Sequence, residues 1–123
     1  MKLSENFTLA ELTGTDTGIA NNPSQDEIRN LKLLVQKVLQ PVRDKFGVIN
    51  VTSGYRSPLV NSAVGGSATS DHVHGRAADI QCEDMAAVFN YIRKKLPFKQ
   101  LIWEFGTDTQ PKWIHVAYDV NNN

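Results

Sequence analysis

Residues 70–79 read Ser70-Asp71-His72-Val73-His74-Gly75-Arg76-Ala77-Ala78-Asp79 and contain two of the three histidines in the chain. The segment 67–76 is rich in Gly, Ser, Thr and His, which is typical of a loop. Ala77–Gln81 then predicts a short strand, because its side chains alternate between one face with polar residues and one face that is entirely apolar. The two faces of this strand carry Ala77, Asp79 and Gln81 on one side and Ala78 and Ile80 on the other.

The third histidine, His115, lies in a second predicted strand, Trp113–Tyr118, and shares a face with Trp113 and Ala117. Each strand therefore presents one polar side chain beside a small alanine, opposite an apolar face. A core strand has little reason to hold a carboxylate or an imidazole in such a place. The pattern favours a metal pocket between the strands.

Two imidazoles and one carboxylate leave positions open on a bound zinc ion, which is the catalytic pattern; structural zinc sites are closed by four ligands, usually with cysteines. The same three ligands could hold Fe(II) in an oxygenase. The spacing alone is equally compatible with histidines scattered over the surface.

On the N-terminal side of this segment, Ser24–Glu27 forms a capping-box sequence that predicts the start of a helix. Apolar residues then recur every three or four positions, so the helix should end near Phe46-Gly47, with Pro41 kinking or dividing it. A strand is expected over Val48–Thr52 and a short helix over about 58–64.

Toward the C-terminus, residues 83–96 predict an amphipathic helix that Pro97 stops. Leu101–Phe105 and Trp113–Tyr118 predict a hairpin connected by Gly106–Pro111. Helices and strands do not alternate regularly. We therefore expect an α+β fold with a small, mainly antiparallel sheet and flanking helices.

The length of 123 residues fits one domain over 1–123, with an ordered core over about 3–119. The 13 basic and 13 acidic residues balance, so neither nucleic acid nor an anionic membrane is an expected partner. One cysteine, Cys82, excludes an internal disulfide. No signal peptide or membrane span is expected, and we expect a monomer.

The pattern Ser70-x-His72-x-x-Gly75-x-Ala77-x-Asp79, followed by Trp113-x-His115, resembles the metal signature of the M15 family of zinc peptidases. Further segments resemble the phage-type branch of this family, and together they cover about residues 3–119. They are Phe7–Leu12, the segment from Asn30 to Pro41, Val51–Ser57, and Asn61 with Gly65-Gly66. The resemblance implies an α+β fold shared with the zinc-binding domain of hedgehog proteins.

The resemblance also implies roles for single residues. His72, Asp79 and His115 become the zinc ligands. Arg56 would point into the cleft, to pair with a substrate carboxylate or to stabilise a developing oxyanion. Ser70 contacts substrate or merely caps the loop, Trp113 packs beside the metal and the substrate, and His74 is a loop residue near the site rather than a ligand.

The sequence departs from the family pattern at Lys112, where many M15 enzymes carry the carboxylate that acts as general base. Glu104 is the expected substitute, because a hairpin that pairs Glu104 with His115 places the two directly opposite each other. Asp108, in the connection, is the alternative base.

The implied activity is hydrolysis of an amide bond in bacterial cell-wall peptides, of the D-Ala-D-Ala carboxypeptidase or endopeptidase type. A non-catalytic, zinc-dependent binding module of the same fold is the alternative that Lys112 keeps open. The resemblance also implies phage or prophage origin, synthesis in the cytoplasm and action at the cell wall after delivery.

Overall fold

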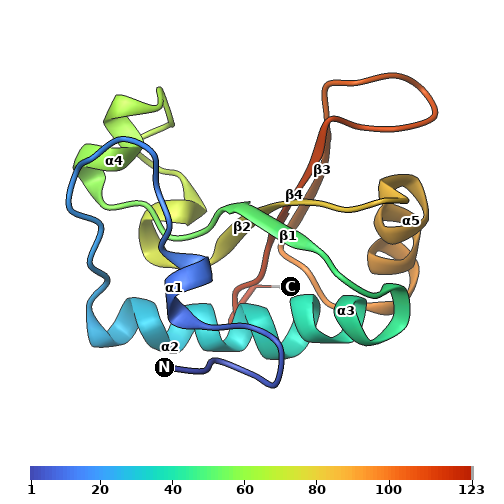
Figure 1. Ribbon diagram of the computed structural model, residues 1–123, viewed down its shortest axis with the longest axis horizontal. Coiled ribbons are helices and arrows are strands. Elements are labelled where there is room, and N and C mark those ends of the chain that lie inside the picture. The colour runs from blue at the N-terminus through green and yellow to red at the C-terminus, as the bar shows by residue number, and fades with distance from the viewer. Residues whose placement is uncertain (123) are drawn as a thin grey trace.

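The computed structural model describes residues 1–122, so residue 123 of the expected domain lies outside the described residues. Four strands form one antiparallel sheet in the order β1-β2-β4-β3, with helices around it (Figure 1). The strands are β1 (Asn50–Ser53), β2 (Ala77–Gln81), β3 (Gln100–Glu104) and β4 (Trp113–Ala117). The predicted α+β class is confirmed. Strand β2 has the predicted bounds, whereas β1 begins at Asn50 rather than Val48.

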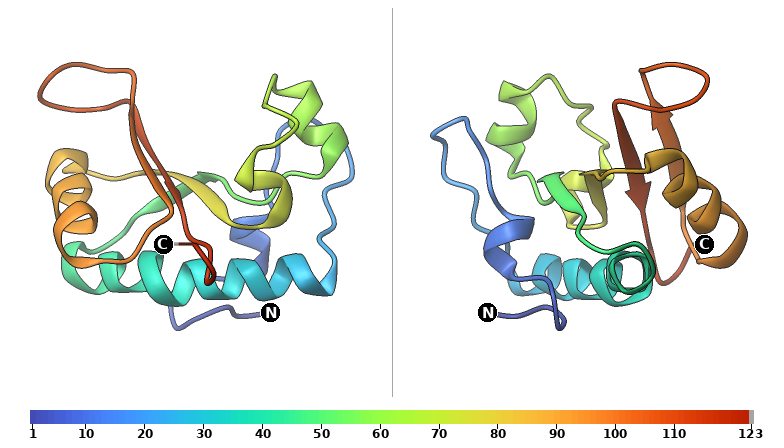
Figure 2. Two further views of the ribbon diagram at one scale, coloured as in Figure 1. Left: turned by 180° about the vertical axis from the view of Figure 1, so that it is seen from behind. Right: turned by 45° about the vertical axis from the view of Figure 1, so that its right-hand side comes forward.

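A long helical rod crosses one side of the sheet and consists of α2 (Gln25–Leu34), η1 (Val35–Leu39) and α3 (Gln40–Phe46) (Figure 2). Ser24 and Glu27 make the predicted capping box, and Gly47 ends the rod with a φ of 86°. Pro41 does not divide the rod. The turn before Pro41 is widened into a π-helix, in which the Gln40 N–H bonds to the Val35 carbonyl five residues back. The irregularity that Pro41 predicts therefore takes the form of a π segment.

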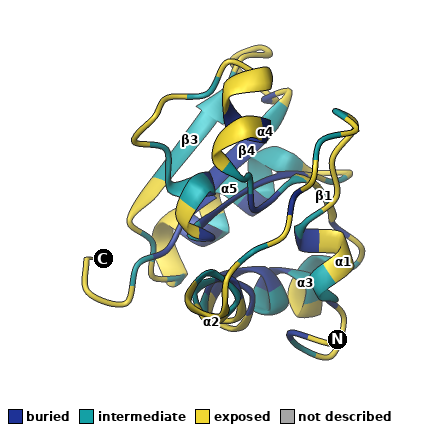
Figure 3. Ribbon diagram, turned by 90° about the vertical axis from the view of Figure 1, so that its left-hand side faces the viewer, coloured by how far each residue is buried: buried dark blue, intermediate teal, exposed yellow. Residues whose placement is uncertain are grey.

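The core lies between this rod and one face of the sheet. The rod and the sheet contribute the buried residues Leu31, Leu34, Val35, Val38, Leu39 and Val42, and Ala78, Ile80, Ile114 and Val116. Strand β4 is buried along most of its length, whereas β3 is only half-buried (Figure 3). Because side chains alternate across a strand, Asp79 and His115 must then lie on the face that turns away from the core.

Four shorter helices complete the fold: α1 (Leu9–Leu12), α4 (Pro58–Ala63), η2 (Asp71–His74) and α5 (Met85–Lys95). α4 confirms the helix expected over about 58–64. η2 is a 3₁₀-helix inside the segment 67–76, which the sequence predicts to be loop throughout. No helix within residues 1–122 is both long and apolar enough to cross a lipid bilayer.

The register of the β3–β4 hairpin differs from the expectation. Ile102 pairs with His115 and Glu104 pairs with Trp113, so the predicted pairing of Glu104 with His115 is wrong by two residues. The connection is closed by a bond from the Lys112 N–H to the Glu104 carbonyl, and Phe105 and Gly106 both take positive φ. A shift of two residues keeps each side chain on its face, so Glu104 still faces the same way as His115.

Candidate metal centre

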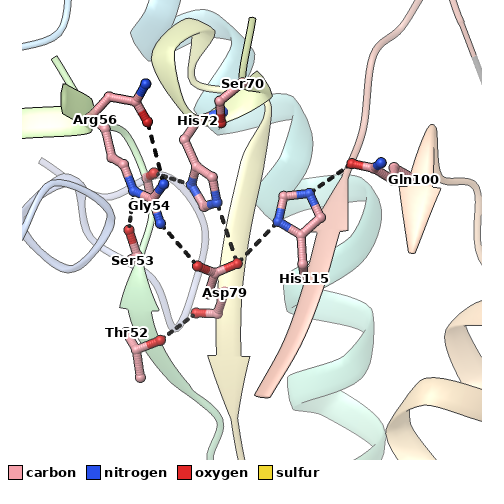
Figure 4. A network of polar contacts seen from close by, with 10 residues as sticks. Thr52, Ser53, Gly54, Arg56, Ser70, His72, Asp79, Gln100 and His115 are labelled. Carbon is pink, nitrogen blue, oxygen red and sulfur yellow. Dashed lines mark hydrogen bonds and ion pairs between the residues drawn. The ribbon is translucent and has the colours of Figure 1, made fainter. Parts of the chain in front are cut away.

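Three separate elements bring the predicted ligands together. His72 comes from η2, Asp79 from β2 and His115 from β4, where it is the direct cross-strand partner of Asp79. All three residues are buried, and one ligand atom from each lies within 4.8 Å of the others. Figure 4 shows both imidazole rings turned toward the carboxylate. Among residues 1–122 this is the only such group of three metal-ligating side chains.

The orientation of His72 is fixed from both ends of its short helix. Ser70 caps η2, because its Oγ accepts the His72 backbone N–H at 3.2 Å. Gly75 ends η2 with a φ of 71° at a point where a Cβ would lie 2.6 Å from the Glu27 carbonyl oxygen. The His72 ring then places Nδ1 2.7 Å from the Gly54 carbonyl oxygen, to which Nδ1–H donates. Its Nε2 is left facing Asp79 at 3.3 Å.

His115 is held in the complementary way. Its Nε2–H donates to Oε1 of Gln100, the first residue of β3, at 3.0 Å. Its Nδ1 then lies 3.1 Å from Asp79 Oδ1. Each histidine thus uses its outer nitrogen as a donor to a protein oxygen and keeps its inner nitrogen for the centre of the site. Such partners fix the tautomer and ring orientation of metal-binding histidines.

The Asp79 carboxylate lies next to the inner nitrogens of both histidines. Burial alone raises the pKa of its carboxyl group, but the hydrogen bonds that it accepts from the inner nitrogens of His115 and His72 when these carry protons, together with the charge of those rings, outweigh burial. The net effect holds the pKa of Asp79 well below its usual range, so the group stays a carboxylate. A carboxylate is the form that ligates a metal ion.

The donor set fits a divalent metal ion. Ligand atoms bound tetrahedrally at zinc distances lie about 3.3 Å apart, and the two contacts of Asp79 Oδ1 measure 3.1 and 3.3 Å. Three protein ligands leave a coordination position open, as in catalytic rather than structural zinc sites. The distances themselves also suit Fe(II), which the same ligand types bind.

Arg56 lies beside Asp79 in the turn after β1. Its Nε donates to Ser53 Oγ at 2.9 Å and its Nη2 to Asp79 Oδ2 at 3.2 Å. Its Nη1 donates to Asn61 Oδ1 at 3.4 Å. A guanidinium carries five N–H donors, so two of them make no hydrogen bond within the part of the chain that the structure describes. Arg56 therefore steadies the carboxylate and retains donors for a further group.

Asn61 reaches Arg56 because a glycine makes room for it. A Cβ on Gly66 would lie 2.0 Å from Asn61 Oδ1, so a larger residue would displace the amide. Asn61 is buried, and its Nδ2 donates to the Ser67 carbonyl at 2.8 Å. The amide thus links the loop after α4 to the arginine.

A pocket of about 400 Å³ opens beside the three ligands. Arg56, Ser70, Glu104 and Trp113 all line it, as the sequence predicts for residues near the site. The remaining walls include Ser67, Thr69, Asp71, Gln100 and Ile102.

Three other polar residues from the sequence analysis lie outside this pocket. His74 is exposed, and its carbonyl accepts a hydrogen bond from Asn30. Asp108 is exposed in the β3–β4 connection and borders a different hollow, next to Trp103 and Phe105. Lys112 is exposed and does not line the pocket.

Gln100 and the Gly54 carbonyl are the parts of the site that sequence reasoning misses. Gly54 belongs to a segment that resembles the family, but nothing in the sequence shows that its carbonyl receives a histidine proton. Gln100 stands just before the predicted strand and carries no motif. Its role follows only from the register of β3 against β4.

Two comparisons with known proteins bear on this site. The chain matches the peptidase M15 family over residues 5–117. Over 78 residues it is 37% identical to a zinc D-Ala-D-Ala carboxypeptidase of Streptomyces albus G. That alignment covers 61% of this chain and 31% of the relative, so the chain spans about a third of the length of this curated relative.

Proposed function

The chain belongs to the peptidase M15 family, and from that premise we propose that it is a zinc metallopeptidase acting on bacterial cell-wall peptides. The observation that carries the proposal is the convergence of His72, Asp79 and His115 in a pocket that a further carboxylate, Glu104, also lines. The similarity to a zinc D-Ala-D-Ala carboxypeptidase supports both the metal and the substrate class.

In this proposal His72, Asp79 and His115 hold the zinc ion, with Gly54 and Gln100 keeping the two rings in position. When bound, zinc supplies a Lewis acid for the scissile carbonyl and lowers the pKa of a water molecule to about 7. The deep burial of the three ligands favours tight metal binding, because little side-chain freedom remains to be lost.

Glu104 is the proposed general base. It lies on the same face as His115, two cross-strand pairs further along the hairpin. Diagonal neighbours of this kind are within reach of a long side chain. Glu104 would accept the proton of the attacking water and pass it to the leaving amine.

Arg56 is the proposed substrate contact next to the metal. Its unpaired donors would bind a carboxylate of the substrate or the oxygen of the scissile carbonyl. Ser70 and Trp113 line the same pocket and would contact the peptide. Ser70 Oγ already accepts a hydrogen bond from the His72 backbone N–H. The Ser70 hydroxyl would therefore act as a hydrogen-bond donor to the peptide.

The position of Glu104 supports an enzyme over a binding module of the same fold. Lys112 suggests lost catalysis only if no other carboxylate reaches the site. In this structure Lys112 is exposed outside the pocket while Glu104 lines it. This arrangement supports the proposal that Glu104, on the neighbouring strand, takes the place of the base that many family members carry at the position of Lys112.

The proposal is tested by incubating the zinc-loaded protein with purified peptidoglycan and identifying new peptide termini by mass spectrometry. The expected result is one kind of new terminus, which also tells carboxypeptidase from endopeptidase action. His115→Ala protein, which lacks one ligand, serves as the matched control and should release nothing. Intact stem peptides after incubation with the wild type, across walls of different composition, would contradict the proposed activity.

A further inference from the structure

Phe105 directly follows Glu104, which lines the pocket, and has an unusual backbone conformation. Its φ is 54°, and it is the only non-glycine residue with positive φ within residues 1–122. A bulky side chain there is sterically disfavoured. The ring is nevertheless 68% exposed, so burial in the core does not compensate for the conformation. Strain of this kind on an exposed aromatic residue points to a role outside the fold.

The loop that follows Phe105 is firmly held. Gly106 continues the turn with a φ of 80°, where a Cβ would lie 2.3 Å from the Gln110 carbonyl oxygen. Gln110 Oε1 accepts the backbone N–H of Ala86 in α5, and the Thr107 N–H bonds to the Gln110 carbonyl. The Phe105 ring is therefore presented in a fixed place, and a ligand that uses it loses little entropy in ordering it.

The ring of Phe105 lies against one residue of the pocket wall, although Phe105 itself borders the neighbouring hollow. It contacts the ring of Trp113 with centroids 5.2 Å apart and planes inclined by 49°. Trp113 lines the pocket and pairs with Glu104 across the hairpin. Most residues that line the pocket are polar, whereas the aromatic pair leads from Trp113, in the pocket wall, to the adjacent hollow that Phe105 borders. A ligand that fills both must carry polar groups inside and a broad apolar face outside.

We propose that Phe105 and Trp113 form a platform for a sugar ring of the glycan strand, while the attached peptide enters the pocket. This inference rests on the proposed function. Stem peptides consist of small or charged residues, so the pyranose ring is the flat group in peptidoglycan large enough to cover Phe105. Phe105 lies three residues beyond Ile102, the partner of His115, which is roughly 10 Å along the strand. A few peptide units span this distance.

The test compares two ligands that differ only in the sugar ring: N-acetylmuramyl-tripeptide and the same tripeptide acylated at its N-terminus with lactic acid. Their dissociation constants are measured by calorimetry with the zinc-loaded protein. Phe105→Gly removes the ring and suits positive φ, so the loop keeps its shape. The platform should favour the sugar-bearing ligand by about three- to tenfold, as aromatic contacts allow. Phe105→Gly should remove that preference and leave the affinity for the lactoyl-tripeptide unchanged.

Val48→Ala is the matched control, because Val48 is also 68% exposed but lines neither the pocket nor the hollow beside Phe105. It should bind both ligands like the wild type. Equal affinity of the wild type for the two ligands, or an equal loss for both in Phe105→Gly, would overturn the inference. Because binding and cleavage are read separately, a sugar preference without hydrolysis contradicts the proposed peptidase activity alone. Hydrolysis without the preference contradicts the platform alone.

Discussion

Asp79 divides its two carboxylate oxygens between the metal centre and the support behind it. Oδ1 meets both imidazole rings, and Oδ2 accepts a hydrogen bond from Arg56. Arg56 in turn is held by Ser53 and Asn61. Each of the three proposed ligands thus has a partner behind it that fixes its direction; such partners tune metal affinity beyond the ligands themselves.

The glutamine behind His115 gives a first prediction at this scale. Gln100→Leu removes the acceptor for His115 Nε2–H but leaves all three ligands in place. Zinc affinity should fall about 10- to 100-fold, because the ring loses its fixed orientation. Competition with a chromophoric chelator measures the change. Gln36→Leu, an exposed position on the long helical rod, is the control. Unchanged affinity in Gln100→Leu would mean that packing alone orients His115.

The second prediction concerns the proposed base. Glu104→Gln keeps the shape of the side chain but cannot accept a proton, so kcat should fall on the order of 10²–10⁴-fold while zinc content and melting temperature stay near wild type. Asp108→Asn is the control, since Asp108 lies outside the pocket. Should Asp108→Asn lose activity instead, the loop supplies the base in the working enzyme and Glu104 does not.

The sequence predicts the three ligands but not their surroundings. His72, Asp79 and His115 follow a spacing that resembles a known metal signature, and strand alternation puts Asp79 and His115 on one face. The sequence predicts the correct face for Glu104, because a register shift of two residues keeps a side chain on its face, but it predicts the wrong cross-strand partner, His115 instead of Trp113. Gln100 depends on the same register, which loop geometry sets and local sequence does not reveal.

At the scale of elements, the end of β1 and helix α1 approach each other unusually closely. The Tyr55 N–H bonds to the Leu12 carbonyl at 2.8 Å. A Cβ on Gly54 would lie 2.4 Å from that same carbonyl oxygen. Gly54 also offers its own carbonyl to His72. The contact between these two elements therefore supports one of the proposed metal ligands, His72, directly.

A third prediction follows from this approach. Gly54→Ala should force α1 and the turn apart and destabilise the fold by about 1–3 kcal/mol, the usual cost of overpacking. It should also weaken zinc binding, because the acceptor of His72 Nδ1–H moves. Urea denaturation and a zinc titration measure the two effects. Gly14→Ala is the control, where a Cβ would meet Ala10 O at an ordinary 3.8 Å. Equal free energies of unfolding for the two variants would show that α1 can move away from the turn without a loss of stability.

The elements themselves could largely be predicted, and the exceptions have physical causes. The capping box, the apolar stripe and strand alternation are local signals, and each gave an element close to the observed one. The π segment before Pro41 could not be predicted, because it depends on how the helix absorbs a missing N–H while keeping its apolar face on the sheet. η2 was missed because a single 3₁₀ turn has no periodic pattern.

At the scale of the whole molecule, the two faces of the sheet have different roles: one belongs to the hydrophobic core and the other carries the proposed metal ligands. One face packs against the rod and supplies the core, and the other carries Asp79 and His115. The pocket is bordered on one side by residues between Gly66 and His72 and on the other by the β3–β4 hairpin. In Figure 1 this hairpin and α4 both project away from the rod. The site therefore joins segments that are distant in sequence.

Because the ligands come from such distant segments, metal binding should stabilise the whole fold, and this is the last prediction. The folded chain presents the three ligands within 4.8 Å, whereas an unfolded chain does not, so zinc binds mainly the folded state. Zinc at about 100 times its dissociation constant adds about 2.7 kcal/mol, which raises the melting temperature on the order of 10 °C. Scanning calorimetry of the zinc-loaded and chelator-treated protein measures the shift. His115→Ala should abolish the shift and His74→Ala should retain it, since His74 is exposed and outside the group of ligands. A zinc-dependent rise in His115→Ala equal to that of the wild type would place the metal elsewhere.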